Sequence, residues 1–505
     1  MITNDRQPQE YMSVNSDILG HPFDDFLSES EPLIKNIDEL PYEIVSELYS
    51  VYDKLSKTAS QNIKSINPAI RVTLCDTLDK MLDRIIDAPL DGLSNSEIPN
   101  KPKGVFAPSL APTIEIGKPL LFNAHILKGI GLSAYLLAKL FNARPTMLFG
   151  TKPEDYPFAS ALPDLEILYL DTEAVEAEDR KRNIFSYGSF NYDNLAGESE
   201  NTYIESYYNH LYDNYSRMDT LIFYGMYPST LNYLDTYRSL RPDGKVYCAL
   251  DMSSHWMKMI PWESESVRKF GEQCNVIATS CRYLRDELNR NTKVNFCCRW
   301  FPNAFYNSTG EKVIADAGYK ENIILYVGRV GTKQKRNEDL LLAFARVSEI
   351  LRNWSLRFVG AIEPDFNDFI NKYFSSRPDL RNRVVFTGAI YDKSELNTEY
   401  AKAKIFVLSS VFEAFPNAYC EALAHGCKFV TSRVDPADDI TNYGELGIKY
   451  PIGDIGALSE ALLKTCEESE KDDFNKHISK ALAYSDKYFN WNRNIKKLKY
   501  MLYRS

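Results

Sequence analysis

The sequence is poor in the residues that mark secreted, metal-binding or membrane-spanning proteins. It has nine cysteines and six histidines in 505 residues, and no CxxC or HExxH spacing. No apolar run reaches the roughly 18 residues of a membrane-spanning helix, and residues 1–5 lack the start of a signal peptide. The scattered cysteines predict reduced thiols in a cytoplasmic protein. No structural or catalytic metal and no cofactor is expected.

Positive charge is also in deficit. The chain has 59 lysines and arginines against 69 aspartates and glutamates, a formal net charge of -10. Broad nucleic-acid binding requires a basic face, so no nucleic-acid partner is expected. The same balance leaves at most peripheral contact with the inner face of a membrane. A content of 44% hydrophobic and 13% aromatic residues predicts a soluble globular protein of two or three domains.

The first 115 residues are predicted to be an addition to the core. Residues 1–30 are polar and acidic, whereas residues 31–88 carry apolar residues three and four apart, which predicts helices. Residues 89–112 are rich in proline, serine, glycine and asparagine and predict a linker. The helical extension could recognise an acceptor, mediate assembly, or cover apolar surface of the next domain, which is the simplest alternative.

Alternating strands and helices are expected from there to about residue 305. A buried strand at 120–124 leads through the glycine-containing segment 128–133 to a helix at 134–141. Further strands are expected at 146–149, 166–170, 220–224, 245–250 and 275–278. A glycine loop in this position either brings backbone close to a phosphate or forms a plain turn. The polar segment 172–206 predicts an insertion or a lid.

The second half repeats this alternation more clearly. Strands are expected at 323–328, 356–360, 384–388, 405–408 and 429–431, with helices at 338–351, 364–374, 393–403 and 456–466. Two doubly wound parallel sheets in one chain predict a cleft between two sets of carboxyl strand ends. Ligands of open α/β sheets bind at such ends.

The stretch from Leu408 to Gly426 is the most informative. It predicts a strand end, a loop carrying Glu413, and a helix that starts at Pro416 and stops at Gly426, because proline suits a first helical position and glycine the residue past a helix end. The free N–H groups of Asn417 and Ala418 would form an anion site.

Two carboxylates flank that predicted anion site. Glu413 precedes the helix and Glu421 lies in its second turn, so the two could address different parts of one elongated anionic ligand. The alternative is an ordinary strand–helix unit with two solvated glutamates. Arg329 and Lys335 follow a strand of the same predicted sheet and could hold a diphosphate. Their alternative is a solvated basic loop.

Several motifs together resemble the retaining GT-B glycosyltransferases of the GT4 type, the glycosyl transferases group 1. The motifs are Gly328-Arg329 with Lys335, Phe386-Thr387-Gly388, the stretch from Glu413 to Gly426, Phe301-Pro302-Asn303-Ala304, and Tyr488-Phe489-Asn490-Trp491. The resemblance covers about residues 118–505 and is strongest over 323–463. It implies a GT-B fold, with two Rossmann-like domains facing a cleft and a final helix that crosses back to the first domain.

The resemblance also implies a donor site. Its donor-binding residues would be Arg329, Lys335, Glu421, Asn417, Ala418, Phe415, Gly388, Gly129 and Gly131. Arg329 and Lys335 would neutralise the diphosphate and Glu421 would accept the ribose hydroxyls. The Gly388 loop would face the nucleobase, and Gly129 to Gly131 would approach the diphosphate from the first domain.

The catalytic residues implied in the same way are Glu413, at the donor sugar, and either Asp251 or His255 from the first domain. The family usually has a histidine after a first-domain strand, whereas here the strand ends at Asp251 and His255 follows four residues later. The chain also has Asp435-Pro436 where the family commonly has two glycines, and Ala304 in place of the junction glycine.

The resulting expectation is an enzyme of four parts: a helical extension (1–115), an acceptor domain (116–305), a nucleotide-sugar domain (306–484) and a returning helix (485–505). It would move a sugar, from a UDP-sugar as first candidate, to a hydroxyl of a glycan, lipid-linked or protein acceptor. The nucleotide sugar is a substrate, and no metal is needed. Alternatives are a catalytically silent GT-B-like binding or chaperone subunit, and a sugar-nucleotide epimerase or phosphorylase.

Overall fold

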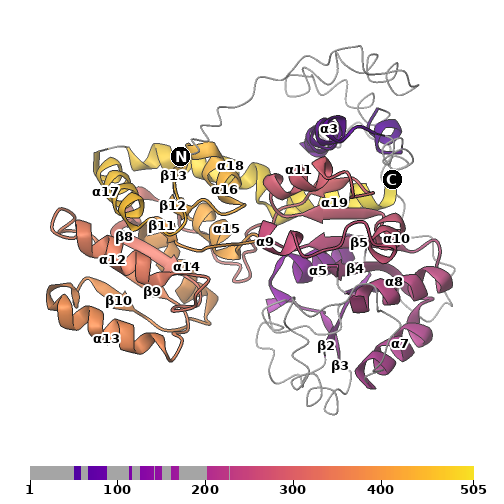
Figure 1. Ribbon diagram of the computed structural model, residues 1–505, viewed down its shortest axis with the longest axis horizontal. Helices are drawn as coiled ribbons and strands as arrows, with labels where there is room; N and C mark the ends of the chain where they lie inside the picture. The colour runs from indigo at the N-terminus through magenta and orange to yellow at the C-terminus, as the bar shows by residue number, and fades with distance from the viewer. Residues whose placement is uncertain are drawn as a thin grey trace.

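Figure 1 presents a computed structural model of the chain. The structure describes residues 51–57, 66–87, 113–116, 126–141, 143–149, 161–169, 202–226, 228–471 and 473–504. The predicted strand at 120–124, the linker at 89–112 and most of the insertion at 172–206 lie outside the described residues.

The first domain is built on a seven-stranded parallel sheet with the order β3-β2-β1-β4-β5-β6-β7. Its strands are β1 (Thr113–Ile116), β2 (Arg144–Phe149), β3 (Glu166–Tyr169), β4 (Met218–Tyr224), β5 (Lys245–Leu250), β6 (Val276–Thr279) and β7 (Cys298–Trp300). The strands predicted near residues 146, 166, 220, 245 and 275 are confirmed within one to two residues at their starts. The sequence prediction missed β1 and the short edge strand β7.

Helices cover both faces of this sheet (Figure 1). They are α5 (Gly129–Phe141), α7 (Thr202–Asn214), α8 (Pro228–Leu240), α9 (Ser254–Met257), α10 (Glu265–Gln273) and α11 (Arg282–Arg290). Because helices lie on both sides, the central strand β4 is buried along its whole length. This explains the apolar run from Leu221 to Phe223 in this strand.

The second domain has a six-stranded parallel sheet with the order β10-β9-β8-β11-β12-β13. Its strands are β8 (Glu321–Val327), β9 (Ser355–Val359), β10 (Val384–Phe386), β11 (Ala403–Leu408), β12 (Lys428–Ser432) and β13 (Gly447–Tyr450). Its main helices are α12 (Asn337–Val347), α13 (Phe366–Ser376), α14 (Lys393–Lys402), α15 (Asn417–Ala424), α16 (Ala437–Thr441), α17 (Ile455–Lys471) and α18 (Phe474–Tyr488). The predicted alternation is confirmed, whereas β13, the short α16 and α18 had not been expected.

The last helix, α19 (Trp491–Arg504), returns to the first domain as expected. Its start is fixed at the junction, where the indole of Trp491 donates to the carbonyl of Ala304 at 2.9 Å. Near its end, the ring of Tyr503 packs 4.6 Å from Phe141, and its hydroxyl bonds Thr220 of β4. The final helix therefore ties the two domains together.

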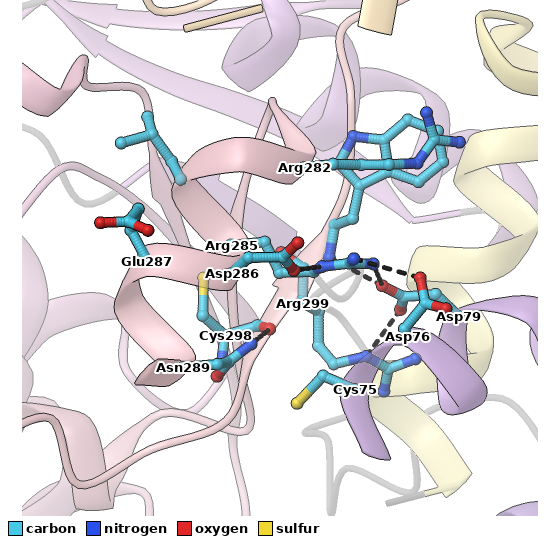
Figure 2. Close-up of polar contacts among 12 residues, drawn as sticks. Cys75, Asp76, Asp79, Arg282, Arg285, Asp286, Glu287, Asn289, Cys298 and Arg299 are labelled. Carbon is cyan, nitrogen blue, oxygen red and sulfur yellow. Dashed lines mark hydrogen bonds and ion pairs between the residues drawn. The ribbon is translucent and has the colours of Figure 1, made fainter. Parts of the chain in front are cut away.

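Helix α3 (Pro68–Asp87) of the amino-terminal extension packs on α11 and on the returning helix α19 (Figure 1). Figure 2 shows the polar contacts beneath it. Asp79 accepts from Arg299 at 2.8 Å and from Arg285 at 3.1 Å. Asp76 also accepts from Arg285, at 3.1 Å. These described residues cover first-domain surface, the simplest of the three alternatives expected for the extension.

One expectation from the cysteines is wrong. Cys75 of α3 and Cys297, which are 222 residues apart in sequence, form a disulfide, while the other seven cysteines are free. Docking of α3 beside the segment that enters β7 brings the two thiols together. No spacing motif in the sequence predicts a disulfide between residues so far apart.

Across the described part of the chain, every helix is too short or too polar to cross a membrane.

Candidate active site between the domains

A cavity of about 340 Å³ lies between the two domains. Its first-domain wall is formed by Gly225, Met226, Asp251, Met252, Ser253, Trp256, Met259 and Ile260, and its second-domain wall by Gln334, Phe412, Glu413 and Ala414. These residues follow the carboxyl ends of β4, β5, β8 and β11. The cavity therefore occupies the position where ligands of parallel α/β sheets bind.

Glu413 and Lys335 meet at the second-domain wall. The ammonium of Lys335 forms an ion pair and hydrogen bond with Oε1 of Glu413, and both side chains are largely buried. Gln334 fixes the two loops to each other, because its carbonyl accepts from the amide of Val411 at 2.8 Å and its side chain donates to the carbonyl of Phe412 at 2.9 Å. The structure thus brings together two predicted site residues from different loops.

Helix α15 starts beside this ion pair. Pro416 precedes the helix as its N-cap rather than its first helical residue, and Gly426 follows its end with φ +70°. The first amides of the helix, those of Asn417 and Ala418, have no carbonyl one turn earlier within α15. The side chain of Asn417 donates to the carbonyl of Leu127 in the first domain at 2.9 Å. The predicted anion site therefore lies at the domain interface.

Glu421 is held one turn further along α15. Its carboxylate accepts from Lys393 of α14 at 3.1 Å and from the hydroxyl of Tyr400 at 2.7 Å. Burial raises the pKa of Glu421, but Lys393 and Tyr400 outweigh that effect and the pKa is lowered. The group is therefore a fixed anion that can accept further hydrogen bonds.

The remaining second-domain residues occupy different environments. Arg329 is exposed just after β8, and among the described residues it has no carboxylate partner. Gly388 has φ +76° and open space around it, so a side chain there would be opposed by the backbone conformation rather than by a neighbour. The ring of Phe415 is buried, stacked 5.5 Å from Phe489. Phe415 can therefore contact a donor only through its backbone.

The first-domain candidates separate by position. Asp251 lines the cavity and accepts a hydrogen bond of 2.5 Å from Tyr224. His255 is exposed, and its ring stacks 5.2 Å from Phe412 of the second domain. Asp251 therefore faces the cavity, whereas His255 lies at its rim.

The sequence predicted a loop at Gly129 and Gly131, and the structure shows that this prediction is wrong. Gly129 and Gly131 are in the first turn of α5, whose apolar sequence extends the helix back through them. Gly129 contacts the domain junction so closely that a Cβ there would lie 2.0 Å from Oδ1 of Asn303. Asn303 in turn donates to the carbonyl of Phe415 at 2.7 Å. Gly129 thus permits close contact between α5, the junction and the second-domain loop.

Sequence reasoning missed several cavity residues. Trp256, Met259 and Ile260 follow the loop that carries Asp251, and Phe412 directly precedes Glu413. The available signal was an aromatic residue next to a predicted site residue, Trp256 after His255 and Phe412 before Glu413. Its weakness is that aromatic residues also fill cores.

Two facing parallel sheets, the cleft at their carboxyl ends and the returning helix α19 together define the GT-B fold of glycosyltransferases. The chain resembles sucrose-phosphate synthase from Thermosynechococcus elongatus with a TM-score of 0.56 and 17% identity, over 77% of this chain and 97% of that one. It also resembles Anabaena Alr3699/HepE in complex with UDP and glucose, with a TM-score of 0.52 and 13% identity, over 77% and 98% of the two chains. These similarities establish the fold.

Sequence comparison adds a family for part of the chain. Residues 321–468 match the family model described as glycosyl transferases group 1. An uncharacterized glycosyltransferase of Methanocaldococcus jannaschii, MJ1607, is 33% identical over 132 residues, 26% of this chain and 32% of that protein. The sulfoquinovosyl transferase SQD2 of Arabidopsis thaliana is 24% identical over 180 residues, 35% of this chain and 32% of that protein. The chain thus spans about a third of the length of these curated relatives.

Proposed function

We propose that the protein is a retaining glycosyltransferase of the GT4 type that transfers a sugar from a nucleotide-diphosphate donor to an acceptor hydroxyl. The observation that carries the proposal is the arrangement along one wall of the cleft. The Lys335–Glu413 pair, the start of α15, and Glu421 follow one another there. Cations and helix amides suit a diphosphate, whereas fixed carboxylates suit the hydroxyls of a sugar and a ribose.

In the proposed reaction, the bond between the anomeric carbon and the donor phosphate oxygen breaks. The acceptor oxygen bonds to the same face of that carbon, and the acceptor proton passes to the departing phosphate oxygen. No protein nucleophile is required. Arg329 and Lys335 stabilise the charge on the leaving diphosphate. Glu413 and Asp251 face the same cavity and hold the reacting sugar between the domains.

UDP-sugars are the first donors to test. The Anabaena structure that shares this fold contains UDP and glucose. The largely buried Lys335 and the exposed Arg329, beside a helix start, suit any nucleoside diphosphate. The acceptor is proposed to be a hydroxyl of a glycan, a lipid-linked glycan or a protein, reached through the first domain. Reaction in the cytoplasm, with at most peripheral membrane contact, agrees with seven free cysteines; the Cys75–Cys297 disulfide is the exception.

A screen of nucleotide sugars by thermal shift would identify the donor, because a ligand that binds the folded state raises its melting temperature. Product stereochemistry, read by the anomeric coupling in NMR, then tests retention. An inverted product would contradict the proposed retention, whereas release of sugar from a UDP-sugar by the purified chain alone would count against a silent subunit. Binding of a nucleotide without turnover on any acceptor would instead favour a silent GT-B-like subunit, and conversion of the donor without an acceptor would favour an epimerase.

A further inference from the structure

Asp435 of the second domain bonds to the first domain at the edge of the cavity. It follows β12, and its Oδ2 accepts from the backbone amide of Ser254 at 2.5 Å. Its Oδ1 accepts from the hydroxyl of the same residue at 2.8 Å. Ser254 is the first residue of α9, so a carboxylate from one domain caps the start of a helix in the other.

Helix α9 has no such cap from its own sequence. Its N-cap residue, Ser253, has the right extended backbone but makes no side-chain cap hydrogen bond. Asp435 therefore supplies, from the opposite domain, an acceptor for the first amide of α9.

The same segment repeats this contact four residues later. Asp439 of α16 accepts from the backbone amide of Arg282, at the start of α11, and from its guanidinium, both at 2.8 Å. The Arg282 guanidinium also lies 3.5 Å from the ring of Trp300. Two carboxylates of one second-domain segment thus cap two first-domain helices.

The position of α9 affects the cleft directly, because residues of this helix contact the Phe412 loop. His255 stacks on Phe412 at 5.2 Å, and Trp256 packs edge-on against the same ring at 6.3 Å. Trp256, Asp251 and Phe412 line the cavity beside Glu413. Any movement of α9 would therefore change the wall that faces Glu413.

We propose that Asp435 is a positioning residue, which holds segment 251–256 against the Phe412 loop and so completes the cavity when the two domains meet. Its effect on catalysis rests on the proposed function, whereas the capping contact does not. Asp435 stands where the GT4 type commonly has a glycine, and a glycine has no carboxylate to cap α9. The cap is therefore a feature of this chain and does not follow from the resemblance.

The contact is tested by hydrogen–deuterium exchange on the full chain. Asp435→Ala should accelerate exchange of the peptide covering 252–258 at least tenfold. Asp438→Ala is the matched control, because Asp438 is in the same segment but is half exposed and pairs with Lys449; it should leave that exchange within twofold of wild type. Equal exchange in wild type and Asp435→Ala would overturn the proposal.

Kinetics with UDP and the identified donor test the positioning role. Asp435→Ala should lower kcat at least tenfold and leave the dissociation constant for UDP within twofold, because the Asp435 carboxylate bonds Ser254 of α9 and is not among the residues proposed for the diphosphate. Ser254→Ala should have a smaller effect, and the double variant should be no slower than Asp435→Ala. Losses that multiply, or a wild-type kcat in folded Asp435→Ala, would overturn the role. If wild type transfers no sugar, the proposed function fails and the exchange experiment still decides the contact.

Discussion

Lys335 and Glu413, 78 residues apart, neutralise each other in the cleft, and only 12% and 8% of their side chains are exposed. The cation proposed for the diphosphate and the carboxylate proposed for the sugar are therefore one coupled unit before any ligand binds. A ligand that draws on Lys335 also changes the environment of Glu413. This links donor binding directly to the reacting end of the cleft.

Removal of Lys335 should therefore weaken donor binding strongly. We expect Lys335→Ala to reduce UDP affinity by about 10- to 100-fold, since a charge-assisted hydrogen bond contributes about 1.5–3 kcal/mol. Isothermal titration calorimetry measures this affinity. Lys333→Ala is the control, because Lys333 is exposed in the same loop. Equal UDP affinities of the two variants would remove Lys335 from the diphosphate site.

Glu421 offers a test of the ribose site. If its carboxylate accepts ribose hydroxyls, wild type should prefer UDP over 2′-deoxy-UDP by about tenfold, on the order of one such hydrogen bond. Glu421→Gln should lose most of that preference. Lys393→Ala should reduce it partly, since Lys393 orients the carboxylate. The exposed Glu395 on the same helix α14 gives the control variant Glu395→Ala. An unchanged preference in Glu421→Gln would show that the ribose lies elsewhere.

The second-domain site was predictable because its chemistry is local in sequence. Glu413, the start of α15 and Glu421 lie within nine residues of each other, and helix punctuation fixes their order. Placing β8 and β11 in one sheet predicted that Lys335 lies near the Glu413 loop, since their carboxyl ends share an edge. The ion pair between the two side chains was not predicted.

The first-domain residues of the site were harder to predict from the sequence, because their positions depend on long-range packing. The sequence could not decide between Asp251 and His255, whose difference in position comes from the contact of α9 with Phe412. It also could not reveal the Cys75–Cys297 disulfide or the cap from Asp435. Each of these joins segments more than 150 residues apart.

The docking of α3 gives a stability prediction. Asp79 is buried and bonds both Arg285 and Arg299, so Asp79→Ala leaves two buried guanidinium groups without that partner. We expect a loss of about 3–5 kcal/mol in the free energy of unfolding, measured by urea denaturation. Asp76→Ala is the matched change on the same helix, and it should cost no more than about 1–2 kcal/mol because Asp76 is partly exposed. A loss for Asp79→Ala no larger than the roughly 1–2 kcal/mol expected for Asp76→Ala would show that the Asp79 contacts do not stabilise the docked α3.

His425 predicts how stability depends on pH. It is buried behind Glu421, its Nδ1 lies 2.7 Å from the carbonyl of that residue, and Tyr400 and Phe305 pack on its ring. Burial lowers its pKa from 6.5 to about 4. Between these values the unfolded chain binds the proton and the folded chain does not, so stability falls as pH drops through this window.

The size of that effect can be isolated with one variant. At pH 5 protonation of His425 in the unfolded chain should cost the folded state about 2 kcal/mol relative to pH 7.5. The total slope contains other groups, since Asp219 has a pKa raised by burial to about 6 and acts in the opposite direction. Urea denaturation at both pH values should therefore compare wild type with His425→Phe. The variant should lose less stability at pH 5 than wild type by about that amount, whatever its stability at pH 7.5. Parallel losses in the two proteins would mean that His425 titrates normally in the folded state.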